Sequence, residues 1–174
     1  MDTAASKELL ADLFEEYSEW YKSLADDYGT LPRSISGVGE NLQQFIYLLD
    51  SVELHHMVRN KFIRFVLDDF HAIAYVYGSL DIRGEGELEE VLDVIAADAA
   101  HYIAGSWLVI RDGEGKVTDL VDKGTREGDD TENHSGSWFL SGSVSFTDAE
   151  KVRYGALWQD AQPCVVFKDR NAEE

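Results

Sequence analysis

The sequence predicts an α+β fold in which an N-terminal layer of about four helices packs on a C-terminal antiparallel meander of about five strands. Apolar residues recur at helical spacing up to about Gly105, and beyond it they alternate along short segments separated by glycine-rich turns. The 174 residues contain no internal repeat and no long linker. They are therefore predicted to form one domain, residues 1–174, with a helical part at 1–105, a sheet part at 106–170 and a tail at 171–174.

Four helices are predicted in the first part of the chain. Residues 6–28 carry apolar side chains at positions i, i+3, i+4 and i+7, and Gly29 is placed to end this helix. A shorter helix is expected at 39–49, a third at 50–78 and a fourth at 85–104. The fourth begins with a run of acids, which suits the positive end of a helix dipole.

Five strands are predicted in the second part. Residues 106–122 predict a strand, a glycine-containing turn and a second strand, which together form a hairpin. Residues 136–146 place apolar side chains at alternate positions, and so do residues 152–158. The segment at 164–168 is predicted to be the fifth strand. These strands would form the meander against which the helices pack.

The composition indicates a cytoplasmic protein. The N-terminus lacks the basic and apolar regions of a secretory signal, and no apolar run approaches the roughly 20 residues that span a bilayer. Cys164 is the only cysteine, so no internal disulfide is available. The chain has 34 acidic and 15 basic residues and a net charge of −19, a field that repels nucleic acid and anionic membranes and attracts basic surfaces.

Residues 50–78 contain three of the five histidines, within an E-x-x-H and a D-x-x-H pattern that begin at Glu53 and Asp68. On one helix these two acids lie about 22 Å apart, so they cannot bind the same ion. Ordinary helix features explain both patterns, because Glu53 suits a capping box and Arg64 and Asp68 suit an i, i+4 ion pair. We therefore predict no metal site and no cofactor.

Three polar residues of the same segment fall on its apolar side, where an unpaired charge is costly. We expect them to pair with groups on other elements and to fix the packing. The alternative is a small-molecule-binding or enzymatic site between the sheet and the helices. The residues that would line this pocket are His55, Arg59, Asp69, Trp138, Tyr154 and Trp158.

No serine or cysteine has the local signature of a catalytic nucleophile. The sequence therefore favours a protein that is not an enzyme.

The negative charge is concentrated in the first 105 residues, which carry 20 acids and 7 bases. Two of the predicted helices present acidic faces there. We expect a partner to bind the following residues: Glu8, Asp12, Glu15, Glu16, Glu19 and Asp26 on the first helix, and Glu85, Glu87, Glu89, Glu90 and Asp93 on the fourth.

Carboxylates held at intervals of several ångströms on a helix imitate the phosphates of a nucleic acid. The sequence thus predicts an interaction or inhibitor protein of the antidefence or immunity type, which binds a basic, nucleic-acid-handling protein and does not itself bind nucleic acid. A generally acidic surface adapted to salt is the competing explanation, and it predicts acids spread evenly over the whole molecule.

Overall fold

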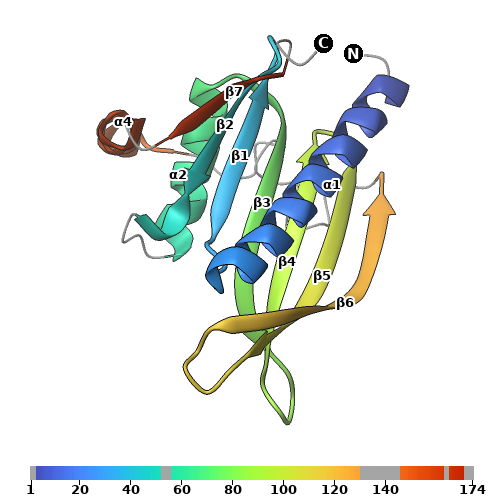
Figure 1. The fold of residues 1–174 in the computed structure, drawn as a ribbon. Coiled ribbons are helices and arrows are strands. Elements are labelled where there is room, and N and C mark those ends of the chain that lie inside the picture. The colour runs from blue at the N-terminus through green and yellow to red at the C-terminus, as the bar shows by residue number, and fades with distance from the viewer. Residues whose placement is uncertain (1–2, 52–55, 130–145, 163–164, 171–174) are drawn as a thin grey trace.

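The computed structural model describes residues 3–51, 56–129, 146–162 and 165–170. These residues form three α-helices and a seven-stranded antiparallel sheet (Figure 1), so the predicted α+β class is confirmed. The helices are α1 (Thr3–Tyr28), α2 (His56–Asp69) and α4 (Asp148–Ala161), with one 3₁₀ turn, η1 (Leu49–Ser51). The strands are β1 (Ser34–Gly39), β2 (Gln43–Leu48), β3 (Ala72–Arg83), β4 (Glu89–Asp98), β5 (Tyr102–Arg111), β6 (Val117–Gly128) and β7 (Val166–Asp169).

The strands lie in the order β6-β5-β4-β3-β1-β2-β7. From β3 to β6 they form a meander in which each strand pairs with the next along the chain. The hairpin of β1 and β2 continues the sheet, because β1 also pairs with β3. At the far edge β7 pairs with β2, with Gln43 opposite Asp169. A strand from near the end of the described chain therefore pairs with one from its first third.

Helices cover both faces of the sheet: α1 crosses one face, and α2 and α4 lie on the other (Figure 1). Alternating side chains of β3 show how this arrangement makes two cores. Ala74 and Val76 are buried with the apolar residues of α1, whereas Tyr75 is buried with residues of α2 and α4. Each helix buries its apolar side against one face, which accounts for the layered fold.

Glycines in the sheet let α1 approach closely. A Cβ atom on Gly78 would overlap the Tyr21 hydroxyl, and one on Gly105 would lie 2.7 Å from the Phe14 ring. The Tyr21 hydroxyl is 2.5 Å from the Ser34 hydroxyl of β1, in a buried hydrogen bond. The position of α1 is thus fixed both by shape and by a hydrogen bond.

Two segments predicted as helices are strands. Residues 39–49 contain a tight turn at Leu42, whose φ is 60°, followed by β2. Residues 85–104 contain a turn, β4 and the start of β5. From Val91 to Ala97, residues on both faces of β4 are buried or half-buried and all but Asp93 are apolar, and such a run cannot be distinguished from a helix by periodicity. The predicted order of helices first and strands afterwards is therefore wrong, since β1 to β4 precede residue 99.

The predicted third helix is shorter than expected. α2 ends at Asp69, and His71 has a φ of 50°, a left-handed conformation that stops a helix. β3 begins directly afterwards at Ala72, so the end of the predicted helix at 50–78 belongs to the sheet.

The predicted strand at 152–158 is part of α4. This helix begins with a capping box, in which the Thr147 side chain accepts a hydrogen bond from the Glu150 amide and the Glu150 side chain accepts one from the Thr147 amide. This start signal outweighs the alternation of the next residues. By contrast, the hairpin predicted at 106–122 is confirmed as β5 and β6, and the strand predicted at 164–168 overlaps β7. Nearly all of the strand predicted at 136–146, and the tail at 171–174, lie outside the described residues.

Candidate functional site

The outer surface of α1 carries a line of exposed carboxylates, which we call the α1 acidic row: Glu8, Asp12, Glu15, Glu19 and Asp26. At 100° per residue they lie within an arc of about 60°, and the row is about 27 Å long. The opposite side of the helix is buried against the sheet. The row follows from the amphipathic sequence of α1, so the sequence predicted these five positions correctly as one face of a helix.

Most of the α1 acidic row lacks a partner. Within the part of the chain that the structure describes, Glu8, Asp12, Glu15 and Asp26 form no hydrogen bond or ion pair. Glu19 accepts a hydrogen bond of 2.7 Å from Lys22. The row therefore presents four uncompensated negative charges to solvent.

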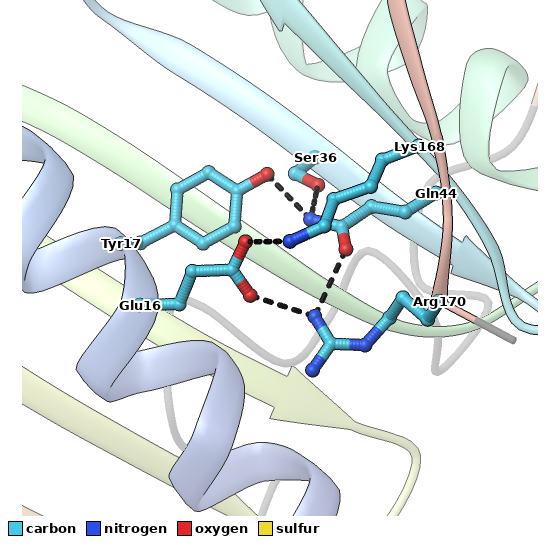
Figure 2. Close-up of polar contacts among 6 residues, drawn as sticks. All are labelled: Glu16, Tyr17, Ser36, Gln44, Lys168 and Arg170. Carbon is cyan, nitrogen blue, oxygen red and sulfur yellow. Dashed lines mark hydrogen bonds and ion pairs between the residues drawn. The ribbon is translucent and has the colours of Figure 1, made fainter. Parts of the chain in front are cut away.

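Glu16 differs from the other predicted acids of α1, because it points to the edge of the sheet (Figure 2). Its carboxylate accepts hydrogen bonds from Lys168 at 2.9 Å and from Arg170 at 2.7 Å. Partial burial by itself would raise the pKa of Glu16, but the hydrogen bonds and positive charges of Lys168 and Arg170 outweigh it and lower this pKa below its usual value. Glu16 is thus ionised and internally neutralised.

A buried polar cluster continues beneath Glu16 (Figure 2). The amide nitrogen of Gln44 donates to the Tyr17 hydroxyl at 2.7 Å and to the Ser36 hydroxyl at 3.1 Å, and its amide oxygen accepts from Arg170 at 3.0 Å. Burial raises the pKa of Tyr17, so the phenol stays protonated. Because these groups satisfy one another, the cluster fastens α1 to β1, β2 and the end of β7.

The second acidic helix predicted from the sequence does not exist. Glu85 and Glu87 are exposed in the turn between β3 and β4, and Glu89, Glu90 and Asp93 lie on β4. These three acids on β4 are paired with bases of β3, β5 and β6. These pairs are Glu89 with Lys123 at 2.6 Å, Glu90 with Arg111 at 2.6 Å, and Asp93 with Arg83.

Among these pairs, Glu90 and Arg111 form a bidentate one. Both carboxylate oxygens accept hydrogen bonds from the guanidinium, at 2.6 and 2.7 Å. These bonds hold the pKa of Glu90 below its usual value. The acids of β4 therefore join strands together, unlike those of the α1 acidic row.

Two of the predicted pocket residues, Tyr154 and Trp158, lie in a packed region. His55 and Trp138 are outside the described residues. The indole nitrogen of Trp158 donates a hydrogen bond of 2.7 Å to Asp69, so Asp69 is paired with another element as expected. Tyr154 and Trp158 are buried between α4 and the sheet, and Trp158 packs on Phe45 of β2.

Arg59, the remaining predicted pocket residue, lies on α2 and is partly buried. Its charge acts on Tyr77 of β3, where it partly offsets the effect of burial on the pKa of that phenol. No described residue of the predicted pocket lines any of the three hollows below.

One hollow, which we call the α1–β2 groove, lies beside the C-terminal half of α1. Its volume is about 610 Å³. Its apolar walls are formed by Trp20, Leu24, Tyr28, Leu31, Pro32 and Leu48, and Asp50 lies at its border. No pattern in the sequence predicts this groove. Trp20 and Leu24 belong to the apolar spacing that predicts the helix at 6–28, and Leu48 lies in the segment predicted as a helix at 39–49.

A smaller hollow of about 250 Å³ lies at the other end of α1, lined in part by Lys7, His101 and Asp129. The His101 ring nitrogen Nδ1 is 3.4 Å from the carboxylate of Asp98, and Nε2 is 3.7 Å from that of Asp129. Asp98 also accepts hydrogen bonds from the backbone amides of Ala100 and His101 at 2.7 Å, which shape the turn between β4 and β5. A third hollow of about 450 Å³ lies around Gly29 and Lys116.

Within residues 3–51, 56–129, 146–162 and 165–170, no three His, Cys, Asp or Glu side chains are grouped so that they could hold a metal ion. None of the described helices is both long enough and apolar enough to span a membrane.

Comparisons with protein-family models, with curated proteins and with solved structures find no match to this chain. The geometry and charge of the described surfaces are therefore the basis on which a function can be proposed.

Proposed function

We propose that the protein binds and blocks a basic, nucleic-acid-handling protein, with the α1 acidic row as its contact surface. The contrast between two sets of carboxylates carries the proposal. Glu89 and Glu90 on β4 are neutralised by neighbouring cations, whereas Glu8, Asp12 and Glu15 on α1 have no such partner in the described part of the chain. What distinguishes α1 is the arrangement: four acids without a cationic partner lie within an arc of about 60° on one rigid helix, which general acidity for salt tolerance does not require.

The rigid position of α1 supports this proposal. The helix is fastened by the bond between Tyr21 and Ser34 and by the ion pairs of Glu16, so the outer carboxylates keep fixed spacings. A surface that is already ordered loses little conformational entropy on binding. Its length of about 27 Å suits an extended cationic surface of the kind that neutralises phosphates.

The proposed mechanism is electrostatic and involves no catalytic step. The uncompensated charges would speed the approach of a basic partner, and the bound protein would cover the surface that the partner uses for nucleic acid. Affinity should therefore fall as salt rises, because the charges that face each other are exposed.

Affinity capture from the native host tests this function. We expect the wild-type protein to retain a basic, nucleic-acid-handling protein at low salt and to release it as salt rises. Glu8→Lys/Glu15→Lys should abolish retention. The matched control is Glu85→Lys/Glu87→Lys, which makes the same charge change in the exposed turn between β3 and β4. The proposal would be contradicted if Glu8→Lys/Glu15→Lys still retained the partner. It would also be contradicted if the control variant lost retention to the same extent.

A second candidate function is small-molecule binding in the hollow that contains His101. The observation that favours it is the placement of one imidazole between two carboxylates, Asp98 and Asp129, with Lys7 at 3.1 Å from Asp129. A thermal-shift screen of small polar compounds, with His101→Ala as the comparison, distinguishes this function from the first.

A further inference from the structure

β7 is the shortest of the described strands, and apolar packing contributes little to its attachment. It pairs on one side only, with β2. Its two large apolar side chains lie mainly in solvent, since Val166 is 60% exposed and Phe167 is 57% exposed. By contrast, all six residues of β1 are buried. Because apolar stabilisation grows with the area removed from water, it holds β7 far less firmly than β1.

Charged side chains add to the backbone pairing of β7 (Figure 2). Lys168 donates to the Glu16 carboxylate at 2.9 Å, and Arg170, which directly follows the strand, donates to the same carboxylate at 2.7 Å. Arg170 also donates to the amide oxygen of Gln44 at 3.0 Å. The Lys168 side chain is 32% exposed and that of Arg170 is 16% exposed, so solvent screens these contacts only in part. Two cations that share one carboxylate thus connect β7 to α1.

That carboxylate adjoins the α1 acidic row. Glu16 follows Asp12 by four residues and precedes Glu19 by three, and residues at these intervals are neighbours on the surface of a helix. Without Lys168 and Arg170, Glu16 would extend the row by one uncompensated charge. The two cations of β7 therefore occupy in the same chain a group of the kind that a basic partner would contact.

Release of β7 would leave α1 in place. Tyr17 is hydrogen bonded to Gln44 of β2, and Tyr21 is hydrogen bonded to Ser34 of β1. Neither bond involves β7, and the buried residues described beneath α1 include none from this strand. The acidic surface would therefore keep its order when β7 opened.

We propose that β7 is an autoinhibitory strand, which neutralises Glu16 when it is paired with β2 and adds this carboxylate to the α1 acidic row when it is released. This inference rests on the proposed function and adds its regulation. A basic partner whose cations reach Glu16 would favour the released state, because only that state offers the contact.

Binding of a simple polycation to charge variants tests the inference. The probe is an oligolysine peptide of about ten residues, which an acidic surface attracts through charge alone. Lys168→Gln/Arg170→Gln removes the two cations from Glu16. The matched control, Lys151→Gln/Arg153→Gln, makes the same charge change on α4, across the sheet (Figure 1). Both control residues are exposed and form no ion pair with another described residue. Calorimetry measures the affinity, and circular dichroism checks that each variant is folded.

We expect Lys168→Gln/Arg170→Gln to bind oligolysine at least about threefold more tightly than the control variant, a gain of the size of one exposed ion pair. When Glu16→Gln is also present, the same two substitutions should give no such gain, because the carboxylate that they uncover is absent. In the wild-type protein, oligolysine should speed hydrogen exchange of the amides of residues 43–46, which lie opposite β7, and should not speed exchange in β3.

The inference would be overturned by equal affinity of Lys168→Gln/Arg170→Gln and the control, or by the same gain with and without Glu16. Oligolysine binding that left exchange of residues 43–46 unchanged would also contradict it, and so would the absence of binding at low salt in all variants. The proposed function is tested separately by Glu8→Lys/Glu15→Lys in the capture experiment. If capture depends on those charges while Lys168→Gln/Arg170→Gln retains the partner no better than the control, the inference fails and the proposed function stands.

Discussion

Glu15 and Glu16 show how one step along a helix changes what a carboxylate does. Glu15 points outward in the α1 acidic row and has no partner among the described residues. Glu16 is turned by about 100° and reaches Lys168 and Arg170 at the edge of the sheet. The first is available to another molecule, and the second stabilises this one.

We expect Glu16→Gln to lower the free energy of unfolding by about 1–2 kcal/mol at neutral pH. The value is modest because the Glu16 side chain is 34% exposed. The pKa of Glu16 in the folded protein is lowered from 4.5, so its contribution is complete above about that pH and is lost as pH falls through the folded value. Urea unfolding of both proteins at neutral pH and well below 4.5 measures the difference.

The control for this experiment is Glu15→Gln, which should change the free energy of unfolding by less than about 0.5 kcal/mol. If the difference between wild type and Glu16→Gln stayed the same at both pH values, ionisation of Glu16 would not be its source.

At the scale of elements, the contact between α1 and the sheet depends on the absence of side chains at two places. Gly78 and Gly105 lie on β3 and β5, where Tyr21 and Phe14 of α1 occupy the space that a Cβ would need. The helix is therefore held closer to the sheet than larger residues would permit. The α1 acidic row and the wall of the α1–β2 groove both depend on this placement of the helix.

Gly105→Ala should reduce the free energy of unfolding by about 1–3 kcal/mol, since the added methyl would lie 2.7 Å from the Phe14 ring. Thermal and urea unfolding measure this loss. Gly86→Ala provides the comparison, because a Cβ there meets no atom within 4 Å, and a change below about 0.5 kcal/mol is expected. Equal effects at the two positions would show that the close approach of α1 does not constrain Gly105.

Across the whole molecule, the net charge of −19 is compensated unevenly. Pairs such as Glu89 with Lys123 and Glu90 with Arg111 neutralise acids of the sheet. Along the outer side of α1, neighbouring acids lie three or four residues apart and repel one another. A surface of this kind reduces stability in the free protein, which is a recurrent cost of binding sites.

Removing that repulsion should stabilise the free protein. Glu8→Gln/Glu15→Gln eliminates the like-charge neighbours that these residues form with Asp12 and Glu19, and we expect the free energy of unfolding to rise by about 0.5–1.5 kcal/mol at low salt. The gain should shrink as salt screens the remaining charges. Calorimetry at low and high salt measures it, with Glu90→Gln as a variant of opposite expected sign. Destabilisation by the α1 variant would mean that its acids have structural roles.

The parts of the fold that were predictable from the sequence depend on local patterns. α1 was predicted because its apolar stripe repeats over six turns, and the hairpin of β5 and β6 because a glycine turn separates two alternating segments. β4 was not predicted, because residues on both its faces are buried over most of its length and the alternation disappears. The single-domain arrangement of residues 1–174 stays a prediction.

The candidate site also has one part that a local sequence pattern predicts and other parts that depend on contacts between distant segments. The α1 acidic row requires only helical geometry, so its positions could be derived from the sequence. The neutralisation of Glu16 could not, because Lys168 and Arg170 are more than 150 positions away along the chain. The α1–β2 groove was missed for a similar reason, since Leu48 reaches it only after β2 has joined the sheet.

The pairing of β7 with β2 has a consequence for how the chain assembles on the ribosome. Gln43 lies opposite Asp169, so the outer edge of β2 is synthesised long before the strand that covers it. Closing such a long loop is entropically costly and is expected late in folding. Until then, the nascent chain would present a free strand edge to other chains. Assembly of β7 would therefore end the period in which the new protein is most prone to aggregate.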